Sequence, residues 1–428
     1  MFVRQELLQN KRGFWLFIPL LLIYACSYFQ RTALPGTIYN TLVQELGFNA
    51  AQMATLGASF VYTYAVFQLI SGALVDRFCG ARVVVSGGLV FIAGTILFPL
   101  CHSTWMLYLA RMLTGIGAST MYLSLVRETD RIFGRKNYAV FFGIAYFCGY
   151  GGGLIGSLPF ELLCQHFPWR HVLLTAAGLG FVVYLLFLYG KSKVSLPPIP
   201  KNSWSLKPFK RILGNPLSWL VILCSGVNFC TYFIIQTVFG KKFLEDFAGY
   251  SSANAALVIF ILTLVCMFTM LTASFLTRLT GNRRRPLVLT ACGICAASSL
   301  LMTAAIYFRF PGWVFGVIYC LFAAAAGIPP IFTMVMQEVN SRDVMAQAAA
   351  VSNMFGYLAV AVCSQLIGML LDSFDKKMLS SGAEIYSPEA YLVLFCIVSV
   401  ISASVFAAAW KLPETKGHYL HPHIADKE

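Results

Sequence analysis

Charged residues are scarce in this sequence, since Asp, Glu, Lys and Arg make up only 11% of its 428 residues. Hydrophobic residues make up 58% and aromatic residues 15%. A soluble domain of this size needs more charge on its surface, so the composition excludes a soluble protein and indicates an integral membrane protein. Apolar runs of about 20 residues, enough to span roughly 30 Å of hydrocarbon, recur along the chain. We predict twelve membrane spans: residues 14–42, 52–74, 82–100, 104–126, 138–160, 171–189, 217–239, 253–276, 286–308, 313–336, 346–371 and 390–410.

Patterns that bind metals or build an enzyme active site are also missing. The thirteen cysteines are mostly scattered singly through apolar spans, which favours a packing role over a disulfide framework. Cys292 and Cys295 have neither a second cysteine pair nor a nearby histidine pattern. No nucleophile, base and orienting group can be assembled at membrane depth, so we expect no enzyme, metal or cofactor.

The net charge of +14 is distributed unevenly. Of the 31 Lys and Arg residues, 23 lie in the N-terminus, the even-numbered loops and the C-terminal tail, 6 in the odd-numbered loops and 2 inside spans, with Arg82 at the edge of the third span counted in the loop. The positive-inside rule then places both termini in the cytoplasm, across the inner (plasma) membrane. The basic loops at residues 207–211 and 283–285 need only anionic headgroups of the lipid bilayer as partners, and no nucleic acid is expected.

A basic and proline-rich segment, residues 191–216, divides the sequence into two halves. We predict an N-terminal six-helix bundle at 1–190, a cytoplasmic linker at 191–216, a C-terminal bundle at 217–410 and a cytoplasmic tail at 411–428. The halves share short loops, glycine-rich spans and a basic cluster after the second span. Such repetition is typical of secondary transporters, which bind their substrate near the midplane between the repeats.

The loop after the second span, from Gly72 to Arg82, resembles the loop signature of the major facilitator superfamily. In that family the Asp sits at a helix terminus and, with basic residues, latches neighbouring helices on the cytoplasmic side. Span four resembles the family's fourth-helix motif, an arginine followed by glycines that let helices approach closely. The resemblance implies an all-α fold of twelve transmembrane helices in two pseudo-symmetric six-helix bundles. It also implies a conformational latch formed by Gly72, Asp76, Arg77, Arg82, Arg111 and Gly115.

The first span carries Tyr24, Tyr28 and Arg31 on one helical face, because their offsets are four and seven. A charge at the bilayer centre costs roughly 2.5 to 3.5 kcal/mol on insertion scales, so Arg31 is a functional candidate. Its planar fork pairs with a carboxylate or phosphate through two hydrogen bonds. The alternative is a structural arginine tied to backbone carbonyls.

This face resembles helix one of the organophosphate:phosphate antiporters, where the arginine grips the substrate phosphate, and of the anion:cation symporters. If the helix continues past Pro35 to Val43, as in those families, Arg31 lies near the midplane. The antiporters place a second arginine in helix seven, but span seven here offers Asn228, Tyr232 and Gln236. With one cation, a singly charged carboxylate fits better than a dianion.

All seventeen acidic residues and six histidines lie in loops, tails or the last turns of spans. Proton-driven transporters usually need a titratable group at depth. We therefore expect a monomeric secondary transporter that exchanges or passively conducts a small organic anion, either a carboxylate or a phosphorylated metabolite. A non-transporting ligand sensor, a proton-coupled symporter and a drug exporter are the alternatives.

Other polar residues in the spans are further candidates for substrate contact. Each has an alternative role, because a buried polar side chain often only hydrogen-bonds a neighbouring helix, with roughly 0.6 to 2 kcal/mol of stabilisation. They are Tyr62, Tyr64 and Gln68 in span two, Tyr122 in span four, Tyr146 and Tyr150 in span five, and Asn353 and Tyr357 in span eleven.

Overall fold

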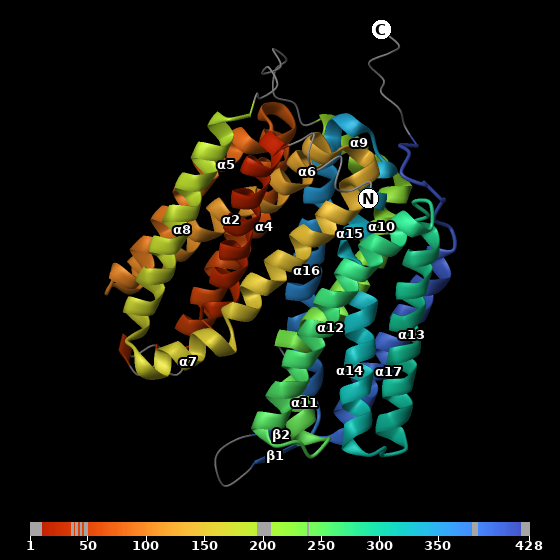
Figure 1. Cartoon of the computed structure of the whole chain (residues 1–428). Helices are drawn as coiled ribbons and strands as arrows, with labels where there is room; N and C mark the ends of the chain where they lie inside the picture. Colours follow the sequence, from red (N-terminus) through yellow and green to blue (C-terminus); the bar gives the residue numbers. More distant parts are fainter. Residues whose placement is uncertain are drawn as a thin grey trace. The chain divides into compact units, whose positions relative to one another are not determined.

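The computed structural model (Figure 1) describes residues 11–35, 38, 42, 45–46, 50–194, 207–237, 239–378 and 384–420. Within these residues, twelve helical segments are long and apolar enough to cross a membrane, which confirms the predicted number of spans. The predicted all-α fold of two six-helix bundles is confirmed as well. In the described part of the chain, the strands form one antiparallel pair, β1 (Lys376–Met378) with β2 (Glu384–Tyr386).

The chain divides into two compact units by its internal contacts. Unit 1 comprises Met1–Phe209 with Arg342–Met354, and unit 2 comprises Lys210–Ser341 with Phe355–Glu428. Residues 342–354 were not included in the predicted N-terminal bundle. They group with unit 1 because the start of the eleventh span is bonded to the end of the second, as described below.

In unit 1, a long helical segment packs against three others, since α6 contacts α2, α4 and α5. Its helices are α2 (Lys11–Ala33), α4 (Ala50–Phe78), α5 (Gly80–Leu100), α6 (Thr104–Ile155), α7 (Leu158–His166) and α8 (Trp169–Ser192), with the 3-10 turn η2 (Arg342–Val344) before α16 (Met345–Asp372). The segment α6 holds spans four and five, joined at Gly134, whose φ of 64° interrupts the helical backbone.

In unit 2, α13 lies beside α14 and α17 (Figure 1). The helices of this unit are α10 (Pro216–Thr237), α11 (Gly240–Asp246), α12 (Ser252–Leu279), α13 (Arg285–Tyr307), α14 (Gly312–Ala326), α15 (Pro329–Glu338), α17 (Pro388–Ala409) and the later part of α16, with α9 (Lys207–Gly214) at the division. Span ten is broken between α14 and α15 at Gly327 and Ile328, because prolines at the start of α15 offer no N–H to continue the ladder.

The first span ends earlier than expected. Helix α2 stops at Ala33, whereas the prediction extended it to residue 42, and residues 36–37 and 39–41 lie outside the described residues. The residue before a proline avoids the helical region, which explains an end just before Leu34 and Pro35. Arg31 therefore lies in the last turn of α2.

Tight packing of α6 on α2 follows from glycines in span five. A Cβ added at Gly149 would lie 2.5 Å from the Tyr24 ring, and one added at Gly152 would lie 2.1 Å from the Ala25 carbonyl oxygen. These positions admit no side chain, so close approach sets the place of Tyr24.

At the ends of α5 and α8, Arg170 ties three chain segments together. Its Nη1 donates to the carbonyls of Pro99 at 2.9 Å and Cys101 at 2.7 Å, and its Nε donates to Glu45 at 3.0 Å. The indole N–H of Trp169 also donates to Glu45.

Candidate functional site

The three residues of the helix-one face lie together as predicted. The Tyr24 hydroxyl donates to the Tyr28 hydroxyl at 3.3 Å, and the Arg31 guanidinium carbon lies 4.5 Å from the centre of the Tyr28 ring. A cation over an aromatic face is attracted by the ring quadrupole. The face is therefore a connected group, with the cation at one end and phenol hydroxyls along it.

Tyr64 of α4 joins this group from a second helix. Its ring centre lies 4.6 Å from the guanidinium carbon of Arg31, so two rings contact the same cation. Asn353, in the part of α16 that belongs to unit 1, donates from Nδ2 to the Tyr64 hydroxyl at 3.4 Å.

Two tyrosines of α6 extend the group. The Tyr146 hydroxyl donates to the Tyr122 hydroxyl at 3.0 Å, and the Tyr122 ring stacks on Tyr24 with centres 6.3 Å apart. Tyr150, a further candidate from the sequence, adds a ring whose centre lies 5.2 Å from that of Tyr28. We call Tyr24, Tyr28, Arg31, Tyr64, Tyr122 and Tyr146 the Arg31 cluster.

Gln68 is not part of this cluster. Its side chain is fully buried, and Nε2 donates to the Ser119 carbonyl of α6 at 3.4 Å. Next to it, the hydroxyls of Ser71 and Ser119 lie 2.8 Å apart. These contacts hold α4 against α6, which is the structural alternative for a buried polar residue.

The unit 2 candidates are mostly bonded to their own bundle. Asn228 donates from Nδ2 to the Cys224 carbonyl at 2.8 Å, and Gln236 donates from Nε2 to Thr263 at 2.8 Å. Tyr232 is buried, and Tyr357 packs its ring 5.3 Å from that of Phe229.

Asp76 caps the start of α16. Its carboxylate accepts hydrogen bonds from the backbone N–H groups of Ala346 at 3.0 Å and Gln347 at 2.8 Å. A negative charge is favourable at a helix N-terminus, where N–H groups lack partners. Gly72 permits this approach, since a Cβ there would lie 2.8 Å from that of Ala350.

The other predicted latch residues have different contacts. Arg82 donates from Nη1 to the Phe78 carbonyl at 3.3 Å, and the Arg77 guanidinium lies over the Phe78 ring at 5.0 Å. A Cβ on Gly115 would lie 2.6 Å from the Phe60 carbonyl oxygen, so this glycine brings α6 against α4.

Arg111 is bonded to the end of α2. It donates from Nη1 to the Gln30 carbonyl and from Nη2 to the Leu34 carbonyl, both at 3.0 Å. These bonds satisfy two carbonyls that the helix end leaves without an intrahelical donor.

The acidic group near residue 128 is buried. Glu128 is fully buried and accepts from the Ala81 N–H at 2.9 Å and from Arg131 Nε at 2.7 Å. Asp130 pairs with Arg342 at 3.1 Å. The N-terminus of α5 supplies the donor that makes burial of Glu128 tolerable.

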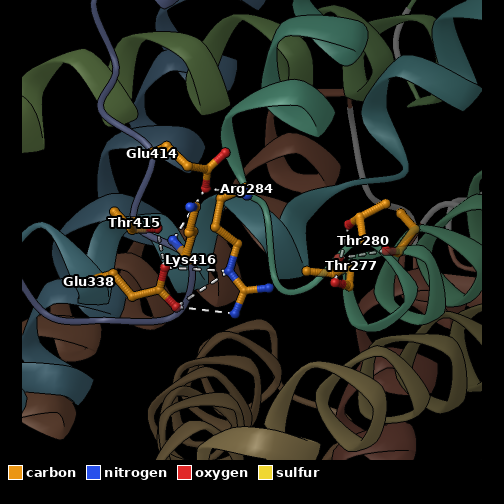
Figure 2. A network of polar contacts seen from close by, with 8 residues as sticks. Thr277, Thr280, Arg284, Glu338, Glu414, Thr415 and Lys416 are labelled. Atoms are coloured by element: carbon orange, nitrogen blue, oxygen red, sulfur yellow. Dashed lines mark hydrogen bonds and ion pairs between the residues drawn. The ribbon is translucent and has the colours of Figure 1, made fainter.

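The basic loop at 283–285 also has protein partners, contrary to the expectation of lipid headgroups alone. Figure 2 shows Arg284 and Glu338 as a buried pair, with Nη2 3.2 Å from Oε1. In the tail, Glu414 accepts from the backbone N–H of Arg284 at 2.7 Å, and Thr415 donates to Glu338. Within the described residues, no group of three or more His, Cys, Asp or Glu side chains is placed to hold a metal ion.

Comparison with known proteins places this geometry in a family. The profile of the Major Facilitator Superfamily matches residues 20–364. The probable anion transporter 3, chloroplastic, of Arabidopsis thaliana is 25% identical over 240 residues, which cover 49% of this chain and 47% of the relative. The human voltage-gated purine nucleotide uniporter SLC17A9 is 23% identical over 250 residues, 53% of this chain and 55% of the relative.

The multidrug resistance protein MdtL of Klebsiella pneumoniae is 23% identical over 273 residues, 62% of this chain and 67% of the relative. The chain thus spans about half the length of the first two relatives. The profile covers most of the sequence, and the twelve spans agree with it. The chain belongs to the Major Facilitator Superfamily.

Proposed function

We propose that the protein is a secondary active transporter that moves a small organic anion, a carboxylate or a phosphorylated metabolite, by alternating access. The observation that carries the proposal is the Arg31 cluster, in which one guanidinium contacts the rings of Tyr28 and Tyr64 at 4.5 and 4.6 Å. Because aromatic rings contact the guanidinium group, an anion pairs with Arg31 through hydrogen bonds in the plane of the guanidinium fork. Phenol hydroxyls of the cluster supply further donors.

Family membership and the names of the relatives support transport rather than an enzyme. Two of the three relatives described above are named as transporters of anions or nucleotides. A further one is named an ascorbate transporter, chloroplastic, from Arabidopsis thaliana. A cation within an aromatic cluster also disfavours export of apolar cations, because it repels them.

Exchange or facilitated passage fits the acidic residues better than proton symport. Four carboxylates toward the ends of candidate spans each accept hydrogen bonds from backbone or basic groups, namely those of Asp76, Glu128, Asp130 and Glu338. In an exchanger the substrate's own charge neutralises Arg31, so no separate titrating residue is needed.

The conformational cycle would use the cap on α16. We assign the latch role to Asp76 and Gly72, since their contacts hold the start of α16 against α4. In the alternating-access cycle, breaking and remaking this cap would accompany movement of the bundles 1–190 and 217–410. The distribution of Lys and Arg over the loops supports an orientation with both termini in the cytoplasm across an inner (plasma) membrane, and we propose that the protein acts as a monomer.

Counterflow in proteoliposomes tests the coupling. The purified protein is reconstituted with candidate anions inside, and uptake of the labelled anion is followed with and without a pH gradient. We expect uptake that depends on the internal anion and is unchanged by the gradient. Uptake that requires the pH gradient and shows no counterflow would contradict the exchange mechanism.

A thermal-shift screen against sugar phosphates, hexuronates, dicarboxylates, amino acids and inorganic phosphate tests the site. A ligand that binds the folded state raises the melting temperature with concentration. The shift should vanish in Arg31→Ala and weaken in Arg31→Lys, because lysine lacks the fork. An Arg31→Lys protein that binds as well as the parent contradicts bidentate recognition.

A further inference from the structure

A second arginine is built into the turn that carries Arg31. The Arg111 side chain is only 2% exposed, and its two bonds reach the carbonyls of Gln30 and Leu34. Gln30 precedes Arg31 directly, and Leu34 follows it by three residues. Arg111 therefore fixes the backbone from which Arg31 projects.

Phe60 of α4 brings the two guanidinium groups close together. The Arg111 guanidinium carbon lies 4.7 Å from the centre of its ring, and that of Arg31 lies 5.9 Å from the same centre. Gly115 allows this because α6 approaches the Phe60 carbonyl too closely for any side chain. The ring attracts both cations through its quadrupole but carries no net charge, so it does not neutralise either.

The acidic side chains described in unit 1 bind other groups or face outward. Glu45, Asp76, Glu128 and Asp130 accept the hydrogen bonds given above. Glu161 and Asp343 are exposed. The carboxyl end of α2 contributes about half a negative charge through its dipole. Two formal positive charges therefore contact one ring, and the hydrogen bonds given above commit four carboxylates of unit 1 to other groups.

We infer that the Arg31–Arg111 pair selects an organic dianion over a monoanion of the same shape. This inference rests on the proposed anion transport and names its substrate class. With Arg31 as the one cation at the site, a single negative charge is favoured; the place of Arg111 reverses that preference. A dianion balances both guanidinium groups, whereas a monoanion leaves repulsion between them uncompensated. Arg111 acts from behind the α2 turn through its charge, without contact with the ligand.

Matched anions that differ by one charge test this inference on the purified full-length protein. Succinate is compared with succinamate, and methyl phosphate with dimethyl phosphate, at a pH about two units above the second phosphate pKa of roughly 6. Thermal shift gives the half-saturating concentration of each. We expect that of the dianion to be lower by about tenfold or more in at least one pair, which is about 1.4 kcal/mol.

The possible results separate the inference from the proposed function. Equal half-saturation within both pairs overturns the dianion preference while leaving anion binding intact. If none of the four anions shifts the melting temperature, both the preference and the anion function on which it rests are contradicted.

Variants of Arg111 then locate the preference. Arg111→Gln removes the charge, and the ratio between dianion and monoanion should fall to near one. Arg111→Lys keeps the charge and should keep most of the ratio, although both affinities fall because the α2 turn loses its bonds. Because the readout is a ratio, general damage to the fold does not imitate the effect.

A matched control removes a cation elsewhere in unit 1. Lys193, at the end of α8, lies over the exposed ring of Tyr189, so Lys193→Gln should leave the ratio unchanged. A ratio that persists in Arg111→Gln, or falls equally in Lys193→Gln, overturns the assignment to Arg111. Should Arg111→Gln fail to fold, the matched pairs on the parent protein still decide whether the dianion is preferred, and loss of the ratio in Arg111→Lys, which keeps the charge, overturns the electrostatic role of Arg111.

Discussion

The two units handle buried polar side chains in different ways. Unit 1 gathers the Arg31 cluster around a cation that contacts several rings. Unit 2 places its corresponding amides, Asn228 and Gln236, in hydrogen bonds to its own helices. Unit 2 instead holds a buried charge contact, the pair of Arg284 with Glu338 at the end of α15. The difference indicates a division of labour between the units: unit 1 recognises the ligand, whereas the polar side chains of unit 2 form hydrogen bonds within its own helices.

The largest expected effect is on ligand binding, and it should be much greater for a variant of unit 1 than for a variant of unit 2. Arg31→Gln should raise the half-saturating anion concentration by about a hundredfold, within the roughly 2–5 kcal/mol lost when one partner of a desolvated charge pair is removed. Asn228→Ser in unit 2 should change it by less than about threefold, since Asn228 is bonded to the Cys224 carbonyl. Titration by thermal shift measures both. Comparable losses in the two variants would end the division of labour.

Removal of a buried carboxylate should destabilise the protein more in unit 2 than in unit 1. Glu338→Gln leaves the Arg284 charge buried without its carboxylate, and removing one partner of such a pair costs about 3–5 kcal/mol. In unit 1, Glu128→Gln should cost less, about 1–3 kcal/mol, because its partner Arg131 is 25% exposed and can be hydrated. Melting temperatures in detergent give the order. A larger loss for Glu128→Gln contradicts it.

Helix packing in unit 1 gives a smaller effect. Gly152→Ala should destabilise the protein by about 1–3 kcal/mol and weaken anion binding, because a Cβ there meets the Ala25 carbonyl of α2 at 2.1 Å. Gly178→Ala in α8 is the matched control, since nothing lies within 4 Å of an added Cβ. Its melting temperature should stay the same or rise. Both quantities come from the same ligand titration, and an unaffected Gly152→Ala would mean that α2 and α6 can separate freely.

The smallest effect concerns pH at the junction made by Glu45. Burial alone raises the pKa of the Glu45 carboxyl. Hydrogen bonds from Trp169 and Arg170 lower this pKa by more than burial raises it, so the pKa lies below its ordinary value. Stability from this group is present above the unfolded-state pKa and is lost as the pH falls through the folded-state value. Between about pH 5 and 3, the parent should lose melting temperature more steeply than Glu45→Gln. Parallel curves would show that the junction contributes nothing.

The sequence predicted what depends on local pattern. Apolar length located the twelve spans, and helical spacing grouped Tyr24, Tyr28 and Arg31. The end of α2 at Ala33 also follows from a local signal, the proline at position 35. The prediction extended the helix to residue 42 because the resembled families have a longer first helix.

What the sequence missed depends on contacts between distant segments. Glu338 pairs with Arg284, 54 positions earlier, and binds Thr415, 77 positions later, and no periodicity links these residues. The closeness of Arg111 to Arg31 depends on Phe60 and on the approach allowed by Gly115. Such contacts arise from tertiary packing, which a single sequence does not reveal.

The tail contacts in unit 2 also have a consequence for biogenesis. Glu414 and Thr415 follow α17, so the ribosome makes them after every membrane helix of the unit. Until then, the start of α13 lacks its carboxylate cap and Glu338 lacks its hydroxyl donor. The segment that carries Glu414 and Thr415 therefore docks onto helix ends that are already in the membrane, and a nascent chain halted before this segment would lack these contacts at the start of α13 and the end of α15.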